Sequence, residues 1–435
     1  MAVVDLKSYP PFVLPVPRHA IHLPPDPLPF WWCDPYQRYL LDLSFSQNDL
    51  TPEELNWLHQ NYEALLARIP TARLLRLIAE FKDESLKQHP ELHEKLQTLT
   101  SLALLHNKKI VFCQNQLLEE LEKRSVPSFL IKGAALIRKI PDTIYFRNIG
   151  DVDFFIPENK VKEVLEHLLN LGCRFAPNLL FGKTFNTIES LLPFRHSFDL
   201  FDPHHQVGLD LHWHLCPQSP NSKFDQILGA LKRTPPPPEA PKTLEANEMF
   251  LLAIVHALGD RWNQPQSHWV IDTLALARYC PNEIDWKKIF WLAKKTEYVA
   301  FIQLALKFLH EIDPETIPQT WIKKSKKLRL TFKEKLDRFF LTQMRRNVEL
   351  RGLSRFIMGI YRTEFFRARG FTLNTLRIYT YYYSHNECHL AIHKRFLNYR
   401  QRVIIPSLKK YWSHAKETLL GRFNFILFWK KHLNS

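Results

Sequence analysis

Two kinds of hydrophobic pattern follow one another along the chain and predict where its helices and strands lie. Across 48–124 the apolar residues recur at helical spacing. The first helix opens at Thr51-Pro-Glu-Glu54, with a capping residue, a proline and two acids. Apolar runs of strand length occupy 128–131 and 152–156, and 207–215 alternates strictly between apolar and polar residues. This order predicts helices that lead into a small α/β unit.

Proline-rich segments mark the boundaries around these elements. We expect 1–47 to form an extended arm, because proline fixes φ and lacks an N–H group. A proline run makes 235–244 a stiff linker. The remaining segments are a helical lead-in over 48–124, an α/β core over 125–234, a helical domain over 245–322 and a basic, aromatic-rich helical tail over 323–435.

The net charge of +15 is concentrated in the tail. Residues 323–435 contain 26 Lys and Arg against 6 Asp and Glu, whereas the rest of the chain has 33 against 38. Clustered cations interleaved with aromatic residues are typical of RNA binding. The apolar run within 422–431, flanked by cations, suits an anionic membrane surface equally well. A solvated basic face on an ordinary helical domain is the third interpretation.

The cysteine pattern and the lack of targeting and membrane-spanning segments in the sequence indicate the cellular location of the protein. The six cysteines are dispersed without a C-x-x-C pair, so buried, reduced thiols are expected. The N-terminus has no signal-peptide pattern, and no run of about 18 apolar residues is present. We therefore expect a cytoplasmic protein, with peripheral membrane contact through 323–435 as an alternative.

The most informative segment is Gly-Asp-Val-Asp-Phe-Phe-Ile at 150–156. Side chains alternate faces along a strand, so Asp151 and Asp153 point the same way. Two converging carboxylates are costly unless a cation neutralises them, and Mg²⁺ suits such oxygen ligands. Two solvated aspartates at a surface strand end are the rival interpretation.

A second segment, Gly-Leu-Asp-Leu-His-Trp-His at 208–214, places Asp210, His212 and His214 on one face of a strand. Asp210 can join the first two acids if the two strands are neighbours. His212 and His214 also permit a zinc site, and hence a zinc-dependent hydrolase. Ordinary polar residues on the exposed face of an edge strand are the third interpretation.

A third segment, Lys132-Gly-Ala-Ala, lies at a strand-to-helix turn. Small residues there let a phosphate approach the N–H groups at a helix N-terminus, and Lys132 adds a positive charge. The spaced glycines and the Lys-Ser/Thr pair of a P-loop are absent from the sequence.

Together these segments resemble the nucleotidyltransferase superfamily of the DNA polymerase β type, and its uncharacterised bacterial branch in particular. The resemblance covers roughly 100–312. It rests on Leu-Ile-Lys-Gly-Ala-Ala-Leu at 130–136, Tyr145, Arg147, the Asp-Val-Asp and Leu-Asp-Leu-His-Trp segments, His256, His268, Asp272, and Ile-Asp-Trp at 284–286. Gly133-Ala134 replaces the Gly-Ser usual in the superfamily, so the serine hydroxyl contact is missing.

The resemblance implies an α+β fold, with a small mixed-sheet nucleotidyltransferase core between N-terminal helices and a C-terminal helical region. It also implies that Asp151, Asp153 and Asp210 are catalytic and hold two Mg²⁺ ions, with Mn²⁺ as a substitute. Lys132, Gly133 and Arg147 would contact the triphosphate of an NTP.

The implied reaction moves a nucleoside monophosphate from an NTP to an unknown hydroxyl acceptor, which is a sugar, a protein side chain or an RNA end. His212, His256 and His268 are candidates for acceptor binding, although each is also explained as a hydrogen-bonded structural residue. The alternative is a non-catalytic nucleotidyltransferase-like protein that binds RNA or an anionic membrane through 323–435.

Overall fold

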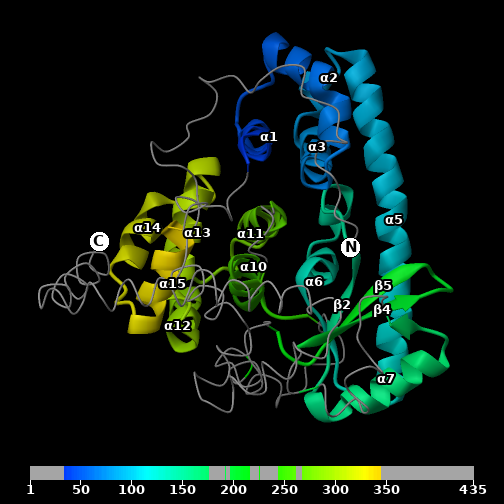
Figure 1. The fold of residues 1–435 in the computed structure, drawn as a ribbon. Helices are drawn as coiled ribbons and strands as arrows, with labels where there is room; N and C mark the ends of the chain where they lie inside the picture. The colour runs from blue at the N-terminus through cyan, green and yellow to red at the C-terminus, as the bar shows by residue number, and fades with distance from the viewer. Residues whose placement is uncertain are drawn as a thin grey trace, which may run out of the picture.

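The computed structural model describes residues 34–175, 192, 196–215, 225, 243–260 and 267–343 (Figure 1). Most of the expected proline-rich arm, the proline run of the linker and the tail from residue 344 onward, including 422–431, lie outside these residues. Within the described part, no helix has both the length and the apolar character needed to cross a bilayer.

Five helices precede the sheet: α1 (Pro35–Phe45), α2 (Pro52–Leu66), α3 (Ile69–Phe81), α4 (Asp83–Leu86) and α5 (Pro90–Lys123). Helix α1 corrects the expectation of an extended arm over the whole of 1–47. Its proline stands in the first turn, where no N–H is needed, and Asp34 caps the helix by accepting from Gln37 N–H. The capping residue predicted at Thr51 is confirmed at the start of α2, where Thr51 and Glu54 form a capping box.

The core of the fold is a mixed sheet of five strands in the order β1-β2-β5-β4-β3. The strands and the intervening elements are β1 (Phe129–Leu130), α6 (Lys132–Lys139), η3 (Pro141–Tyr145), β2 (Asp151–Phe155), η4 (Glu158–Lys160), α7 (Val161–Asn170), β3 (Arg174–Phe175), β4 (Ser197–Asp202) and β5 (Val207–His212). Strands β2 and β5 pair in parallel, and the other neighbouring pairs are antiparallel. The predicted α+β fold class is confirmed.

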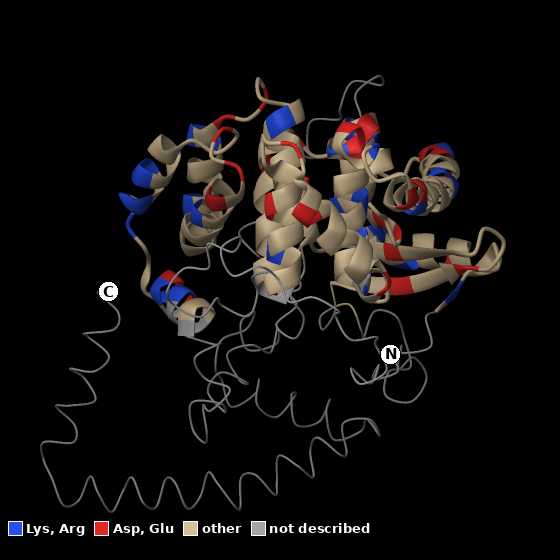
Figure 2. Cartoon of the chain, turned by 90° about the horizontal axis from the view of Figure 1, so that it is seen from above, with Lys and Arg blue, Asp and Glu red and all other residues tan. Residues whose placement is uncertain are grey.

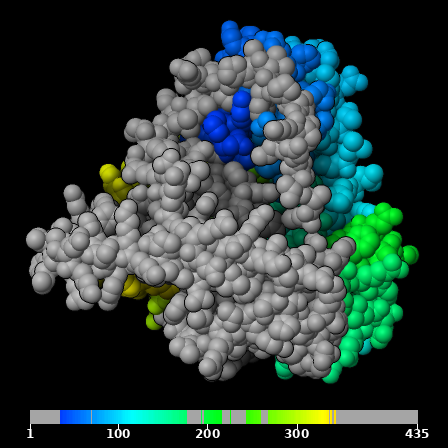
Figure 3. All heavy atoms as spheres, viewed as in Figure 1, coloured from blue at the N-terminus to red at the C-terminus, as the bar shows by residue number. Residues whose placement is uncertain are grey.

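The two faces of this sheet differ in chemistry. Val152, Phe154 and Leu211 point to one face and are completely buried, and helix α5 packs there. Helix α6 contacts β2 and in turn contacts α10 and α11, so these helices cover the other side (Figure 1). Figure 3 shows that α5 (cyan) and the strands β4 and β5 (green) adjoin along one edge of the molecule.

The remaining described helices are α10 (Ala246–Asp260), α11 (His268–Tyr279), α12 (Trp286–Thr296), α13 (Val299–Ile312), α14 (Gln319–Lys326) and α15 (Phe332–Gln343). Their apolar residues join those of the sheet and of the N-terminal helices in one buried cluster. Helix α1 contacts α13, where Arg38 Nη2 donates to the Glu311 carbonyl (3.1 Å) and the guanidinium lies over the Phe308 ring. Helix α1 therefore connects the N-terminal helices with the C-terminal helices.

The start of the basic tail lies in α14 and α15, at the left of Figure 2. Lys323, Lys324 and Lys326 fall in the last turn of α14, where cations favour the helix dipole. The Lys324 ammonium lies 3.8 Å from the centre of the Trp321 ring. A cation of the tail is thus paired with an aromatic ring of the preceding helical domain.

A buried ion pair fixes the C-terminal helices to the sheet. Arg147, just before β2, forms a two-pronged contact with Asp272 of α11, in which Nη2 donates to Oδ2 at 3.0 Å and Nε donates to Oδ1. The two side chains are 9% and 8% exposed, so water screens them little. Removal of one partner would leave an uncompensated charge in the interior.

The change Asp272→Ala should lower the free energy of unfolding by about 3–5 kcal/mol, because it strands the Arg147 guanidinium without a counter-charge. Urea denaturation followed by far-ultraviolet circular dichroism measures this loss. The double change Arg147→Met, Asp272→Leu should recover much of it, since the desolvated charge is gone.

The matched control for that experiment is Lys123→Ala, which breaks the exposed ion pair with Glu120 (2.7 Å) and should leave the midpoint unchanged. If Asp272→Ala shifts the midpoint no more than Lys123→Ala does, the pair does not hold the helices to the sheet.

Candidate functional site

Strand register brings three carboxylates into one row. Asp153 of β2 lies opposite Asp210 of β5, and Asp210 lies opposite Asp199 of β4. Residues directly opposite each other on neighbouring strands share a face of the sheet. Asp151, two positions before Asp153, shares that face one row away. The structure thus brings the Asp-Val-Asp segment and Asp210 together.

Lys132 and His212 lie among these acids. The Lys132 ammonium donates to Asp153 Oδ1 (2.6 Å) and Asp210 Oδ2 (3.4 Å). His212 Nε2 lies 2.7 Å from Asp210 Oδ2 and 3.3 Å from Asp153 Oδ1. Lys132 begins α6 with φ at 54°, a backbone conformation that is uncommon outside glycine and that recurs at functional sites. Two basic side chains therefore balance the charge of the carboxylate row.

Burial and mutual charge shift the acidities of this cluster. Burial, reinforced by the charge of Asp153, raises the pKa of Asp151 to about 7. Burial works the same way on Asp210, but His212 and Lys132 outweigh it and hold the pKa of Asp210 well below its usual range. For His212 the charge of Asp210 overcomes the effect of burial and raises the pKa to about 9. The charged forms of Asp210 and His212 are thus stabilised by each other against the effect of burial.

A cavity of about 210 Å³ opens over this row. Its wall combines the sheet with α3, α6, α10 and α11. The polar residues that line it are Arg73, Lys132, Arg147, Asn148, Asp151, Asp153, Asp199, Asp210, His256, His268 and Asp272. His256 and His268, which the sequence marks only as histidines of a helical region, therefore face the same space as the acids.

A buried asparagine holds the loop that leads into β2. Asn107 of α5 donates through Nδ2 to the carbonyls of Ile144 (2.7 Å) and Arg147 (2.8 Å), and its Oδ1 accepts from Ile149 N–H (3.2 Å). Arg76 of α3 donates to the Tyr145 carbonyl (2.8 Å). The N-terminal helices thus position the backbone just ahead of Asp151.

Two glycines of the site lie close to neighbouring side chains. A Cβ at Gly208 would lie 3.2 Å from Asp151 Cβ, its cross-strand neighbour. A Cβ at Gly133 would lie 3.2 Å from Arg147 Nη2. Both distances are tighter than ordinary van der Waals contact. Gly133 thus allows the Arg147 guanidinium to lie against the first turn of α6.

The structure separates some residues that the sequence grouped. The Arg147 guanidinium lines the cavity but is bound by Asp272 and by the Asn148 carbonyl. His212 reaches the acids, whereas His214 Nδ1 lies 3.2 Å from Asp225 Oδ2. Among the described residues the two histidines belong to no common metal-ligand group, so a zinc hydrolase built on His212 and His214 finds no support.

Two charged residues of the cavity wall, Asp199 and Arg73, belong to none of the sequence motifs. Asp199 stands in Ser-Phe-Asp-Leu-Phe-Asp at 197–202, and the alternation of that segment is the signal that could have placed it on a strand. Arg73 is one cation of an amphipathic helix, and no pattern distinguishes it from its neighbours.

The acidic cluster fits a divalent metal ion. Oxygen atoms of Asp153 and Asp210 and a ring nitrogen of His212 lie within 4.8 Å of one another. Among the described residues, the buried Asp210 Oδ1 has no hydrogen-bond partner. A buried carboxylate oxygen without a partner is costly unless a cation supplies the missing interaction. The carboxylate oxygens of Asp153 and Asp210 can therefore hold a hard ion such as Mg²⁺.

Comparisons with known proteins place the chain in a family. No curated protein sequence matches it. Among solved structures it is similar to the antibiotic-resistance factor ANT(2'')-Ia, over 46% of this chain and 95% of that chain, with 14% sequence identity and a TM-score of 0.28. A score this low carries no argument about fold or function. The family model described as "Uncharacterised nucleotidyltransferase" matches residues 59–312, more than half of the chain. The chain therefore belongs to the uncharacterised nucleotidyltransferase family.

Proposed function

We propose that the protein is a Mg²⁺-dependent nucleotidyltransferase that moves a nucleoside monophosphate from an NTP to a hydroxyl acceptor. The observation that carries this proposal is the parallel pairing of β2 with β5, which sets Asp153 opposite Asp210 beside Asp151. Membership of the nucleotidyltransferase family supports the same reaction class.

Three acids of the site, Asp151, Asp153 and Asp210, have tasks in this proposal. Asp151, Asp153 and Asp210 would hold two divalent ions, which stabilise the attacking and leaving oxygens of an in-line displacement at the α-phosphate. Asp210 would also accept the proton of the acceptor hydroxyl. The hydroxyl oxygen then bonds to the α-phosphorus, and pyrophosphate leaves. Mn²⁺ can serve in place of Mg²⁺, since it prefers similar ligands.

Cations around the cavity suit the triphosphate. Lys132 lies at the start of α6, where the first N–H groups have no partner within the helix and the dipole favours anions. Arg147 lies against Gly133 beside this helix end and contributes charge while it stays paired with Asp272. Arg73 supplies a third cation on the opposite wall, from α3. The arrangement offers positive charge next to the acids on which metal ions would bind.

The acceptor would enter from the side of α10 and α11. The cavity volume of about 210 Å³ is below the roughly 300–1,000 Å³ of typical ligand pockets, so the described residues enclose the phosphates rather than a whole nucleotide. His256 and His268 line this space and can hydrogen-bond a hydroxyl. A sugar, a protein side chain and an RNA end each carry such a group.

The first test is calorimetric titration of each of the four NTPs into the full-length protein, with and without Mg²⁺. We expect metal-dependent binding of at least one NTP. The double change Asp151→Ala, Asp153→Ala should weaken it on the order of 100-fold or more, because the metal bridge to the phosphates is lost. Transfer of label from an α-phosphate-labelled NTP to product measures turnover in parallel.

A matched control is Asp142→Ala, which removes an exposed carboxylate of η3 that is not among the cavity-lining residues and should leave NTP binding unchanged. Unchanged binding in the double variant would overturn the metal-site assignment. Absence of binding for every NTP would favour the non-catalytic alternative, in which 323–435 binds RNA or an anionic membrane. Deletion of 344–435, which leaves the described helices α14 and α15 in place, should then abolish a steeply salt-dependent affinity for one of these partners.

Lys132 generates a separate prediction, because its ammonium competes with a metal ion for Asp153. The change Lys132→Met should raise the affinity of the nucleotide-free protein for Mn²⁺ by about tenfold or more, since one charge-assisted hydrogen bond no longer opposes binding. It should also weaken NTP binding, because the phosphates lose a cation. Electron paramagnetic resonance of free Mn²⁺ measures the first effect and calorimetry the second.

The control is Lys139→Met on the same helix, whose ammonium pairs with Glu283 (2.6 Å). It should change neither affinity. A fall in Mn²⁺ affinity in Lys132→Met would show that the lysine assists metal binding rather than competing with it.

A further inference from the structure

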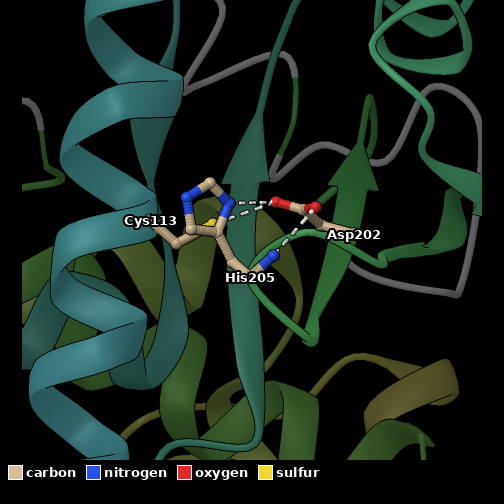
Figure 4. A group of neighbouring side chains, drawn as sticks. All are labelled: Cys113, Asp202 and His205. Atoms are coloured by element: carbon tan, nitrogen blue, oxygen red, sulfur yellow. Dashed lines mark hydrogen bonds and ion pairs between the residues drawn. The ribbon is translucent and has the colours of Figure 1, made fainter.

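A second cluster of metal-ligating side chains lies on the opposite face of the sheet. Cys113 comes from α5, Asp202 from the end of β4, and His205 from the turn between β4 and β5 (Figure 4). Asp202 is three positions from Asp199, so the two side chains point to opposite faces. This cluster is therefore separate from the carboxylate row of the proposed active site.

Three different donor types converge there. Asp202 Oδ2 lies 2.5 Å from His205 Nδ1 and 3.8 Å from Cys113 Sγ. The three ligand atoms all lie within 4.8 Å of one another. Asp202 is held in place by backbone N–H groups, since its Oδ1 accepts from His204 (2.9 Å) and His205 (3.3 Å). The carboxylate is thus fixed before any ion arrives.

The cluster does not have the chemistry of a catalytic triad. Burial, with the charge of Asp202 second, raises the pKa of the Cys113 thiol to about 12, so little nucleophilic thiolate exists near neutral pH. Cys113 and His205 each contact Asp202 rather than each other. The thiol therefore has a carboxylate as its hydrogen-bond partner and not the imidazole that activates a catalytic cysteine.

We propose that Cys113, Asp202 and His205 bind one Zn²⁺ ion, with a solvent molecule as the fourth ligand. Sulfur, imidazole nitrogen and carboxylate oxygen are the donors that Zn²⁺ takes, whereas Mg²⁺ and Ca²⁺ avoid sulfur. On binding, the thiol proton leaves to solvent as the sulfur–zinc bond forms. His205 would bind through Nδ1 as the neutral ring with its proton on Nε2, so the Nδ1 proton that now bonds to Asp202 leaves to solvent, and two bonds to the metal replace this hydrogen bond.

The distances agree with a tetrahedral ion. Zn–S and Zn–O bonds of about 2.3 and 2.0–2.2 Å place the two ligand atoms about 3.5 Å apart. The Cys113 Sγ to Asp202 Oδ2 distance of 3.8 Å is close to this value. The His205 ring needs to move away from Asp202 by about 1 Å, and it lies in a turn where its side chain is 23% exposed. The same exposure gives the ion a path from solvent.

The ion would join the turn between β4 and β5 to the middle of α5. In the structure, Phe112 of α5 also packs against the His205 ring, with ring centres 5.9 Å apart. A site that exists only in the folded chain stabilises the fold when its metal binds. The proposed role is therefore structural, and independent of transferase activity.

Cobalt substitution tests the proposal on the full-length, chelator-treated protein. Co²⁺ bound by a thiolate gives a near-ultraviolet charge-transfer band, which the carboxylate row on the other face, having no thiol, cannot produce. We expect one equivalent of Co²⁺ to generate the band and one equivalent of Zn²⁺ to abolish it. Zn²⁺ should also raise the melting temperature.

The decisive variants are Cys113→Ser and His205→Gln, and the matched control is His204→Gln, the exposed neighbour in the same turn. Cys113→Ser should remove the band, and His205→Gln should weaken Co²⁺ binding by at least about tenfold. His204→Gln should bind as the wild type does. Absence of the band in the wild type at saturating Co²⁺, or a band that persists in Cys113→Ser, would overturn the proposal. Neither outcome would bear on NTP binding, which the titrations above test separately.

Discussion

The arrangement of the site depends on the positive charges that lie beside the buried carboxylates of Asp153 and Asp210. Parallel pairing of β2 with β5 places Asp153 against Asp210 on one face, where solvent no longer screens their repulsion. Lys132 and His212 supply the opposing charge, and both must lie at hydrogen-bonding distance to do so. Such an arrangement contributes little net stability compared with an apolar cluster. The metal binding proposed above would account for oxygen ligands that are kept beside Lys132 despite this low net stability.

The surroundings of the row show how the fold meets this requirement. On the apolar face α5 packs against the strands, and from the same helix Asn107 fixes the loop before Asp151. On the polar face Asp272 of α11 draws Arg147 away from solvent and brings α11 over the acids. Strand pairing, loop position and helix docking thus all constrain the same few atoms. A small error in any of them would separate the two carboxylates.

The sequence predicts the local part of this arrangement and misses the long-range part. Alternation places Asp151 and Asp153 on one face of a strand, and it places Asp210 and His212 on one face of another strand. That the two strands are neighbours is a finding of the structure. The motif resemblance leads to the family that the comparisons confirm. The pairing of Arg147 with Asp272, 125 positions later, leaves no periodic signal. The contact between Cys113 and Asp202, 89 positions apart, likewise has no signal in the sequence. Helix α1 was missed because the prolines of the arm outweighed a local signal, Asp34 followed by Pro35, that marks a helix start.

Helix α1 also determines what counts as one folding unit. It lies outside the segment that matches the family model, 59–312, yet Leu40 and Leu41 are completely buried and Arg38 binds the backbone of α13. A chain that began at residue 59 would start inside α2 and leave an apolar seam open between α3 and α13. The buried core therefore runs without a break from α1 to the C-terminal helices of the described chain. The core that α1 completes thus extends beyond the segment 59–312 that matches the family model.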